Sequence, residues 1–181
     1  MLKEGKEEQR FIALLVEDEE DLTARLNAKV IGKGVLRSSA LERDAYLKMC
    51  FFQYMIANTD WAIPNRHNLE MLSVPGVERV VAIPYDFDYA GFSGTSYAVP
   101  YSSLPIDDVN ERYFMGRNVT EAEAVEMSRF FLDKKEEIKQ RCSDFGNLEE
   151  KELARLHRSL DQFFDILEND KKVRRTFVTE E

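Results

Sequence analysis

Acidic and amide side chains that could bind a metal ion gather in residues 58–91. Four of them flank two short apolar runs: Asp60, Asn68, Asp86 and Asp88. The runs, 69–72 and 80–83, are separated by the turn-forming sequence Ser73-Val-Pro75-Gly76-Val77, a pattern that predicts a β-hairpin. The polar groups should then meet at one end of the hairpin. Magnesium is usually held by one or two carboxylates and by substrate phosphates, so we expect Mg²⁺ (or Mn²⁺) to bind there.

The order of these residues resembles the catalytic core of the protein-kinase-like superfamily. In that superfamily an Asp, and then an Asn just before a short strand, precede a turn and a second strand that ends in Asp-Phe. The similarity is to atypical branches, the HipA-type and CotH-type kinases, whose last element reads more like Tyr85-Asp-Phe-Asp88 than Asp-Phe-Gly. The resemblance covers a motif core of roughly 35 residues.

The resemblance implies a role for each polar residue. Asp60 would be the catalytic Asp that orients or accepts the proton of the attacking hydroxyl, and Asn68 and Asp86 would hold the metal ions that bridge the phosphates of ATP. Asp88 occupies the position of a Gly in protein kinases and could be a further metal carboxylate, because side chains two apart on an extended segment share a face. The expected partners are a nucleotide and an unidentified phosphoryl acceptor.

Two alternatives remain open at these positions. Asn65 has the protein-kinase spacing, five residues after Asp60, whereas Asn68 stands immediately before the strand. We favour Asn68, because the element that holds a ligand sets its direction. Asx side chains also form ordinary turns and caps, so any single one of these residues could be purely structural. For His67 we expect a hydrogen-bonded loop position, and for Trp61 a packing role.

Composition narrows the function classes. The 181 residues, 44% of them hydrophobic, suit one globular domain, residues 1–181. A net charge of −9 argues against nucleic-acid binding. No apolar run approaches 18 residues, which predicts no membrane span, and the first residues lack the apolar core of a signal peptide. The two cysteines, Cys50 and Cys142, predict neither a disulfide framework nor a zinc site.

Hydrophobic periodicity predicts an α+β fold, a mostly helical lobe around the short hairpin that resembles the C-terminal lobe of a protein kinase. The expected elements are a hinge-like strand at 10–16, a helix whose first turn is the acidic run 17–21, a central helix at 39–57 opened by the capping box Ser39-Ala-Leu-Glu42, and C-terminal helices at 120–168. The last of these should be two helices, 120–141 opened by the capping box Thr120-Glu-Ala-Glu123, and one capped by Asn147. Residues 89–117 should be irregular, with Arg112 and Arg117 available to a phosphate or an acidic residue, and the tail 171–181 mobile at its end.

The sequence also departs from the kinase pattern. A complete kinase places a Gly-rich loop and a strand-borne Lys before the hinge, but about nine residues precede the first expected strand, and no Gly-x-Gly-x-x-Gly occurs. Ser143-Asp-Phe-Gly146 follows a charged helix and is interpreted as a helix stop. We therefore expect an incomplete phosphotransferase lobe. The alternatives are a non-catalytic interaction module and a metal-dependent hydrolase that uses Asp86 and Asp88.

Overall fold

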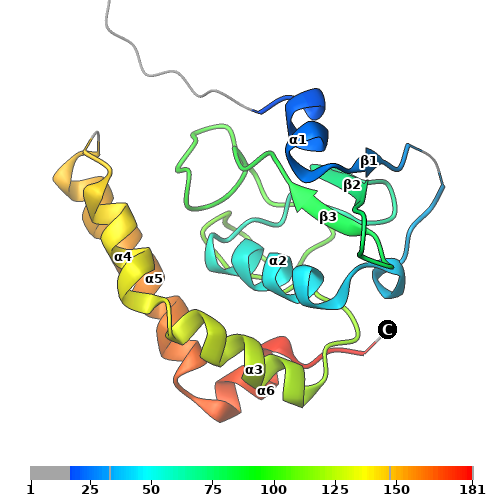
Figure 1. Ribbon diagram of the computed structural model, residues 1–181. Helices are drawn as coiled ribbons and strands as arrows, with labels where there is room; N and C mark the ends of the chain where they lie inside the picture. The colour runs from blue at the N-terminus through cyan, green and yellow to red at the C-terminus, as the bar shows by residue number, and fades with distance from the viewer. Residues whose placement is uncertain (1–16, 33, 147, 181) are drawn as a thin grey trace, which may run out of the picture.

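The computed structural model describes residues 17–32, 34–146 and 148–180. Within them the fold is α+β, with six α-helices and one three-stranded antiparallel sheet (Figure 1). The elements are α1 Glu19–Leu26, β1 Lys29–Val30, the short 3₁₀ helix η1 Ser38–Ala40, α2 Arg43–Met55, β2 Leu69–Ser73, β3 Val81–Pro84, α3 Glu121–Leu132, α4 Lys135–Asp144, α5 Glu150–Leu167 and α6 Asp170–Phe177. The strand expected at 10–16 and the cap expected at Asn147 lie outside the described residues.

The hairpin predicted from the two apolar runs is present. β2 and β3 pair antiparallel, with Leu69 opposite Pro84 and Leu72 opposite Val81. The connecting turn uses Gly76 at φ 82, a conformation that favours glycine. β1, a strand that was not predicted from the sequence, pairs with the other side of β2, with Lys29 opposite Ser73. Two residues are too few for a periodic pattern to show, which is why this strand was missed.

Helix α2 lies between the sheet and helix α3 (Figure 1), and eight of its 13 residues are buried. The capping box expected at Ser39 is wrong, because residues 38–40 form η1 and Leu41 bridges to Val80 beside the sheet. Glu42 caps α2 instead: its carboxylate accepts hydrogen bonds from the backbone N–H groups of Asp44 and Ala45. The bridge at Leu41 thereby fixes α2 against β3, the strand that leads to Asp86.

The C-terminal helices differ from the expectation in one break. Thr120 and Glu123 form the predicted capping box, but the single helix expected over 120–141 is divided into α3 and α4 at Asp133 and Lys134. α3 keeps its buried face, which includes Phe131, on the core, whereas α4 has no buried residue and lies beside α5 (Figure 1). The break lets the chain leave the core, and α4 ends at Asp144, as the helix-stop interpretation of Ser143-Asp-Phe-Gly146 requires.

Most of the mixed-charge tail, 171–181, whose end was expected to be mobile, belongs to helix α6, Asp170–Phe177. Asn169 caps it by accepting hydrogen bonds from the backbone N–H groups of Lys171 and Lys172. Val173 and Phe177, four residues apart, are 1% and 0% exposed, and the Phe177 ring lies 4.2 Å from that of Phe51. Only these two apolar side chains anchor the helix. The rest of the stretch is mostly charged, so its composition gave no signal from which a packed helix could be predicted.

Arginines hold the irregular segment between β3 and α3. Arg155 donates hydrogen bonds to the carbonyls of Gly91 and Phe92 at 2.9 and 3.0 Å. Arg112 donates to the carbonyls of Met55 and Ser159 at 3.1 and 2.7 Å. The expectation that Arg112 pairs with a phosphate or an acid is therefore wrong, because its partners are backbone carbonyls, and that of Met55 lies at the end of α2, where the helix supplies no further N–H donor.

Candidate functional site

The C-terminal end of α2 positions the first site residue, Asp60. Asn58, 1% exposed, donates a hydrogen bond to Gln53 of α2 at 2.9 Å and accepts one from the backbone N–H of Asp60 at 2.9 Å. The adjacent carbonyl of Ala57 accepts the N–H of Gly91, where a Cβ would lie only 2.5 Å from a backbone oxygen. The backbone at Asp60 is therefore held in place by the buried, hydrogen-bonded residues that precede it.

Both carboxylate oxygens of Asp60 have a donor. His67 Nε2 lies 2.8 Å from Oδ1, and Asn68 Nδ2 lies 2.8 Å from Oδ2 and 2.8 Å from the Asp60 carbonyl. Because a carboxylate only accepts, the His67 proton belongs on Nε2, and the two acceptors around the Asn68 amide fix which of its ends is the NH₂ group. The arrangement orients the carboxylate while leaving it lone pairs for a third donor.

The loop that carries His67 and Asn68 has left-handed backbone positions. Asn68 lies at φ 54, a conformation that Asn adopts more readily than most residues, and Arg66 lies at φ 59. The Arg66 guanidinium donates to the carbonyls of Ile31 and Gly34, which ties the loop to the segment after β1. His67, expected to be a hydrogen-bonded loop residue, also exchanges backbone hydrogen bonds with Ala62.

Of the two candidate amides, the structure brings Asn68 to Asp60. Its carbonyl also accepts the backbone N–H of Tyr85 at 3.4 Å, directly after β3. Asp86 is the next residue, so one asparagine joins the Asp60 loop to the segment that carries Asp86. Asn65 is exposed in the turn and makes no side-chain hydrogen bond to the described residues.

Asp86 and Asp88 form a turn of their own. Asp86 Oδ1 accepts the backbone N–H of Asp88 at 3.3 Å, and Tyr97 donates its hydroxyl to Asp88 Oδ2 at 3.0 Å. The Asp88 carbonyl accepts from the hydroxyls of Ser93 and Thr95. The hydrogen bond to Asp88 raises the pKa of Tyr97 above its ordinary value. Tyr97 was not a candidate from sequence, since nothing linked it to Asp88 nine residues away.

The oxygen atoms at this end of the hairpin are suitable ligands for a hard cation. Within the described residues, Asn68 Oδ1 and Asp86 Oδ2 accept no hydrogen bond, and both belong to residues at the same end of the hairpin. Residues 17–32, 34–146 and 148–180 contain no cluster of three or more His, Cys, Asp or Glu side chains that could hold a metal ion by themselves. An amide and one or two carboxylates fit magnesium that is shared with substrate phosphates.

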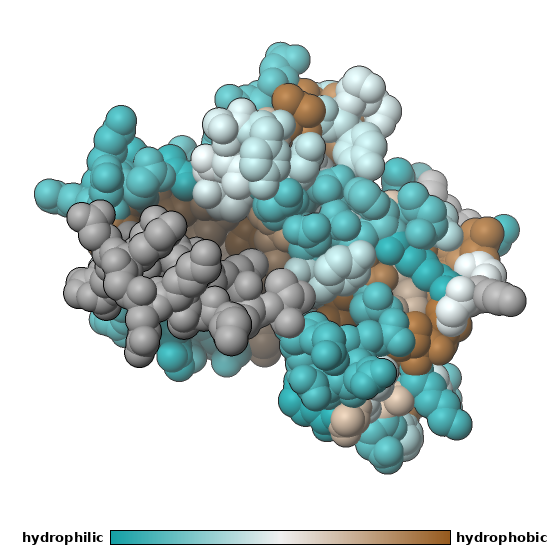
Figure 2. Space-filling view, turned by 90° about the horizontal axis from the view of Figure 1, so that it is seen from above, coloured by the Kyte–Doolittle hydropathy of each residue, from teal (hydrophilic) through white to brown (hydrophobic). Residues whose placement is uncertain are grey.

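Asp60 and His67 line an open hollow of about 550 Å³. Its other walls come from Tyr89 and from residues 99–102 of the irregular segment. The ring of Tyr101 lies 6.4 Å from that of His67, edge to face. The face of the molecule seen from above in Figure 1 is mainly hydrophilic, with hydrophobic side chains in its hollows (Figure 2). The hollow is open to solvent and the Asp60 side chain is 16% exposed, so a polar group can approach this carboxylate.

Comparisons of the chain with protein-family models, with curated proteins and with solved structures found no match. Among the helices that the structure describes, none is long and apolar enough to cross a membrane.

Proposed function

We propose that this chain carries the metal-binding side of a phosphotransferase site that resembles the atypical, HipA-type and CotH-type branch of the protein-kinase-like superfamily. Asp60 is the catalytic Asp, and Asn68 and Asp86 are the ligands of Mg²⁺. The proposal is supported chiefly by Asn68, whose amide binds Asp60 and whose carbonyl meets Tyr85, the residue before Asp86.

Positioning accounts for most of catalysis in phosphoryl transfer. The donors from His67 and Asn68 hold the Asp60 carboxylate in one orientation, and its remaining lone pairs are available to the hydroxyl of a phosphoryl acceptor. A bound Mg²⁺ would supply electrostatic stabilisation of the phosphates. Asp88, through its N–H, holds one oxygen of Asp86 and leaves the other for the ion.

Metal titration tests the ligand assignment. We expect Mn²⁺ to bind weakly with one site per chain, and Asp86→Asn to lose this binding, as followed by the paramagnetic resonance signal of free Mn²⁺. Asp107→Asn, which removes an exposed carboxylate from the irregular segment, is the matched control. Equal titrations of the Asp86 variant and the wild type would remove Asp86 from the site.

Turnover tests how much of a phosphotransferase these 181 residues supply. The sequence contains no Gly-x-Gly-x-x-Gly to cover the nucleotide phosphates. We expect this chain alone to bind MgATP weakly and to show no sustained phosphotransfer. Steady ATP turnover that Asp60→Asn abolishes would overturn this expectation and would require another cation, such as Lys29, to take over the missing contacts.

One observation favours the interaction-module alternative. The Asp86 to Asp88 turn is closed by hydrogen bonds from within the chain, including that of Tyr97, as in a purely structural turn. Under this alternative Mn²⁺ does not bind, and Asp86→Asn lowers only stability. A two-metal hydrolase needs more carboxylate or histidine ligands than the pair Asp86 and Asp88 offers.

A further inference from the structure

A second and larger hollow, about 690 Å³, lies beside the Asp60 loop. Residues from four parts of the chain line it: 35–39, 61–64, 103–104, and the stretch 113–118, which contributes Tyr113, Met115, Arg117 and Asn118. Pockets of 300–1,000 Å³ are typical of sites for small molecules, so this one is large enough for such a ligand. It is a separate space from the hollow that Asp60 and His67 line.

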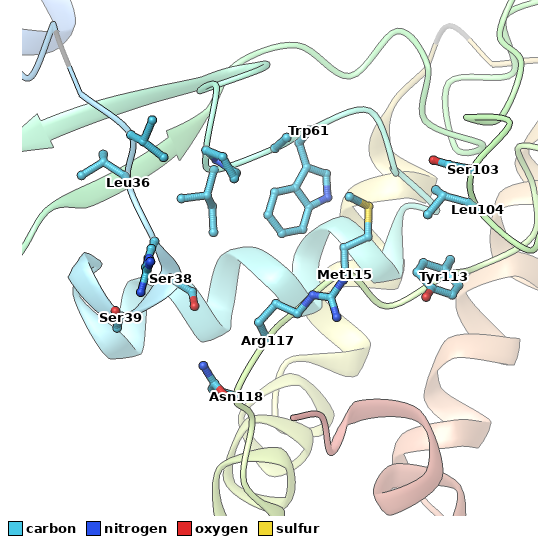
Figure 3. A pocket seen from close by; sticks show the side chains of 15 residues that line it. Leu36, Ser38, Ser39, Trp61, Ser103, Leu104, Tyr113, Met115, Arg117 and Asn118 are labelled. Carbon is cyan, nitrogen blue, oxygen red and sulfur yellow. The ribbon is translucent and has the colours of Figure 1, made fainter. Parts of the chain in front are cut away.

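Apolar side chains form the body of this hollow. They include Leu36, Trp61, Ile63, Leu104 and Met115. Figure 3 shows the indole of Trp61 projecting into the space between its own segment and the one that carries Met115 and Arg117. An apolar portion of a ligand would be buried here, and apolar burial is the main source of affinity for small molecules.

Two arginines line the same hollow, Arg37 and Arg117. Both are exposed, and neither forms an ion pair with any residue that the structure describes. In a chain of net charge −9, two uncompensated guanidinium groups beside one apolar hollow favour an anion there. Ser38, Ser39 and Asn118 add hydrogen-bonding groups to the same walls.

Trp61 contributes a further unsatisfied group. The residue is 3% exposed, and its indole Nε1 has no hydrogen-bond partner among the described residues. A buried donor without an acceptor is unfavourable by about 1–3 kcal/mol. Met115 lines the same hollow, and its flexible side chain can shift to admit a ligand oxygen to the indole N–H.

We propose that this hollow binds a small amphipathic anion, a carboxylate or phosphate carried on an apolar body. The apolar body packs against Trp61 and its neighbours, and the anionic group lies between Arg37 and Arg117. The inference is independent of phosphotransfer at Asp60. The two hollows nevertheless share the segment 60–67, with Trp61 facing one and His67 the other, so an occupant would also hold the Asp60 loop.

Trp61 is the only tryptophan of the chain, so its fluorescence reports occupancy of this hollow directly. The probes are octyl phosphate and octanoate as two anions, octylamine as the matched cation, and inorganic phosphate as the anion without an apolar body. We expect a saturable change with at least one of the two octyl anions, with binding about tenfold tighter than that of octylamine, and none with inorganic phosphate. Preference between the two anions identifies the headgroup.

Variants test the location. The double variant Arg37→Gln, Arg117→Gln should weaken octyl anion binding about tenfold, leaving octylamine unaffected or tighter. Leu104→Glu, which places a carboxylate at the wall, should weaken it further, whereas Arg158→Gln, an exposed arginine on α5, should leave it unchanged. Unfolding curves confirm that each variant is folded. Equal affinity for octyl anions and octylamine, or unchanged anion affinity in the double variant, would overturn the proposal.

Discussion

Two regions of this molecule are built from different interactions. In the aromatic core, α2, the irregular segment, α3, α5 and α6 meet through the rings of Phe51, Phe114, Phe131, Phe163 and Phe177. At the hairpin end, hydrogen bonds join the polar residues Asp60, His67, Asn68, Asp86 and Asp88. Apolar burial is non-directional and stabilises the fold, whereas the directional bonds fix where oxygens point. The comparison predicts that changes in the core cost stability and changes at the hairpin end cost binding.

The largest effect is expected from Phe177→Ala in the aromatic core. Phe177 is fully buried and lies against the rings of Phe51, Tyr54 and Phe114. Removing the ring leaves a cavity and should lower the free energy of unfolding by about 3–5 kcal/mol, as measured by urea denaturation. Val178→Ala, at the next and 40% exposed residue, should cost less than about 0.5 kcal/mol. Similar losses for both variants would show that α6 does not anchor the core.

A smaller loss in the free energy of unfolding is expected from Arg112→Gln. Arg112 lies between the two regions. Arg112 donates to the carbonyl of Met55 at the end of α2 and to Ser159 of α5, and burial lowers its pKa. Losing these hydrogen bonds from a charged donor should cost about 2–3 kcal/mol, because the Met55 carbonyl at the end of α2 is left without a partner. The exposed Arg158→Gln is the control. A cost as small as that of the control would mean that the irregular segment holds itself in place.

Glu123→Gln tests an ion pair at the edge of the core. Arg43 donates two hydrogen bonds to the Glu123 carboxylate and so lowers its pKa from the usual 4.5 to about 2. The stabilisation is present above about pH 4.5 and is lost as the pH falls toward 2. The variant should lose about 1–2 kcal/mol at pH 7 after screening by solvent, and less near pH 3. Gln retains the capping-box contact, which isolates the charge.

The control for this pair lies on the same helix. Glu121 pairs with Arg174 in an exposed geometry, with both side chains more than half exposed. Exposed pairs contribute about 0–1 kcal/mol, so Glu121→Gln should change stability little at any pH. A loss in the Glu123 variant that does not shrink in acid would attribute the effect to packing.

The sequence predicted the parts of the fold whose pattern is local. The hairpin, the Thr120 capping box and the presence of a last long helix, α5, follow from patterns that can be read within one element. Helix α6 and strand β1 did not, because two buried residues anchor α6 and a two-residue pairing defines β1. The break between α3 and α4 depends on where the core ends, which is a property of the packed chain.

The candidate site divides in the same way. Asp60, Asn68 and Asp86 were predicted as site residues from their order along the chain, and of the two candidate amides it is that of Asn68 that contacts Asp60. The contacts of His67 with Asp60 and of Tyr97 with Asp88 required the structure. Both contacts join residues in loops. Whether such residues approach each other depends on turn geometry, which produces no periodic pattern in the sequence.

The smallest expected effect distinguishes the two asparagines at the hairpin end. Glycine is the appropriate replacement, because Asn68 lies at φ 54, where glycine is unstrained and alanine is not. Asn68→Gly removes both the proposed metal ligand and the donor that orients Asp60, and should weaken Mn²⁺ binding about tenfold. Asn65→Gly removes an exposed amide that is neither the proposed metal ligand nor a donor to Asp60, and it should leave the Mn²⁺ affinity unchanged. Side-by-side titrations of the two folded variants measure the difference. If Asn65→Gly weakened binding more, the metal ligand would follow the protein-kinase spacing, and the Asn68 amide would serve only to hold the loop.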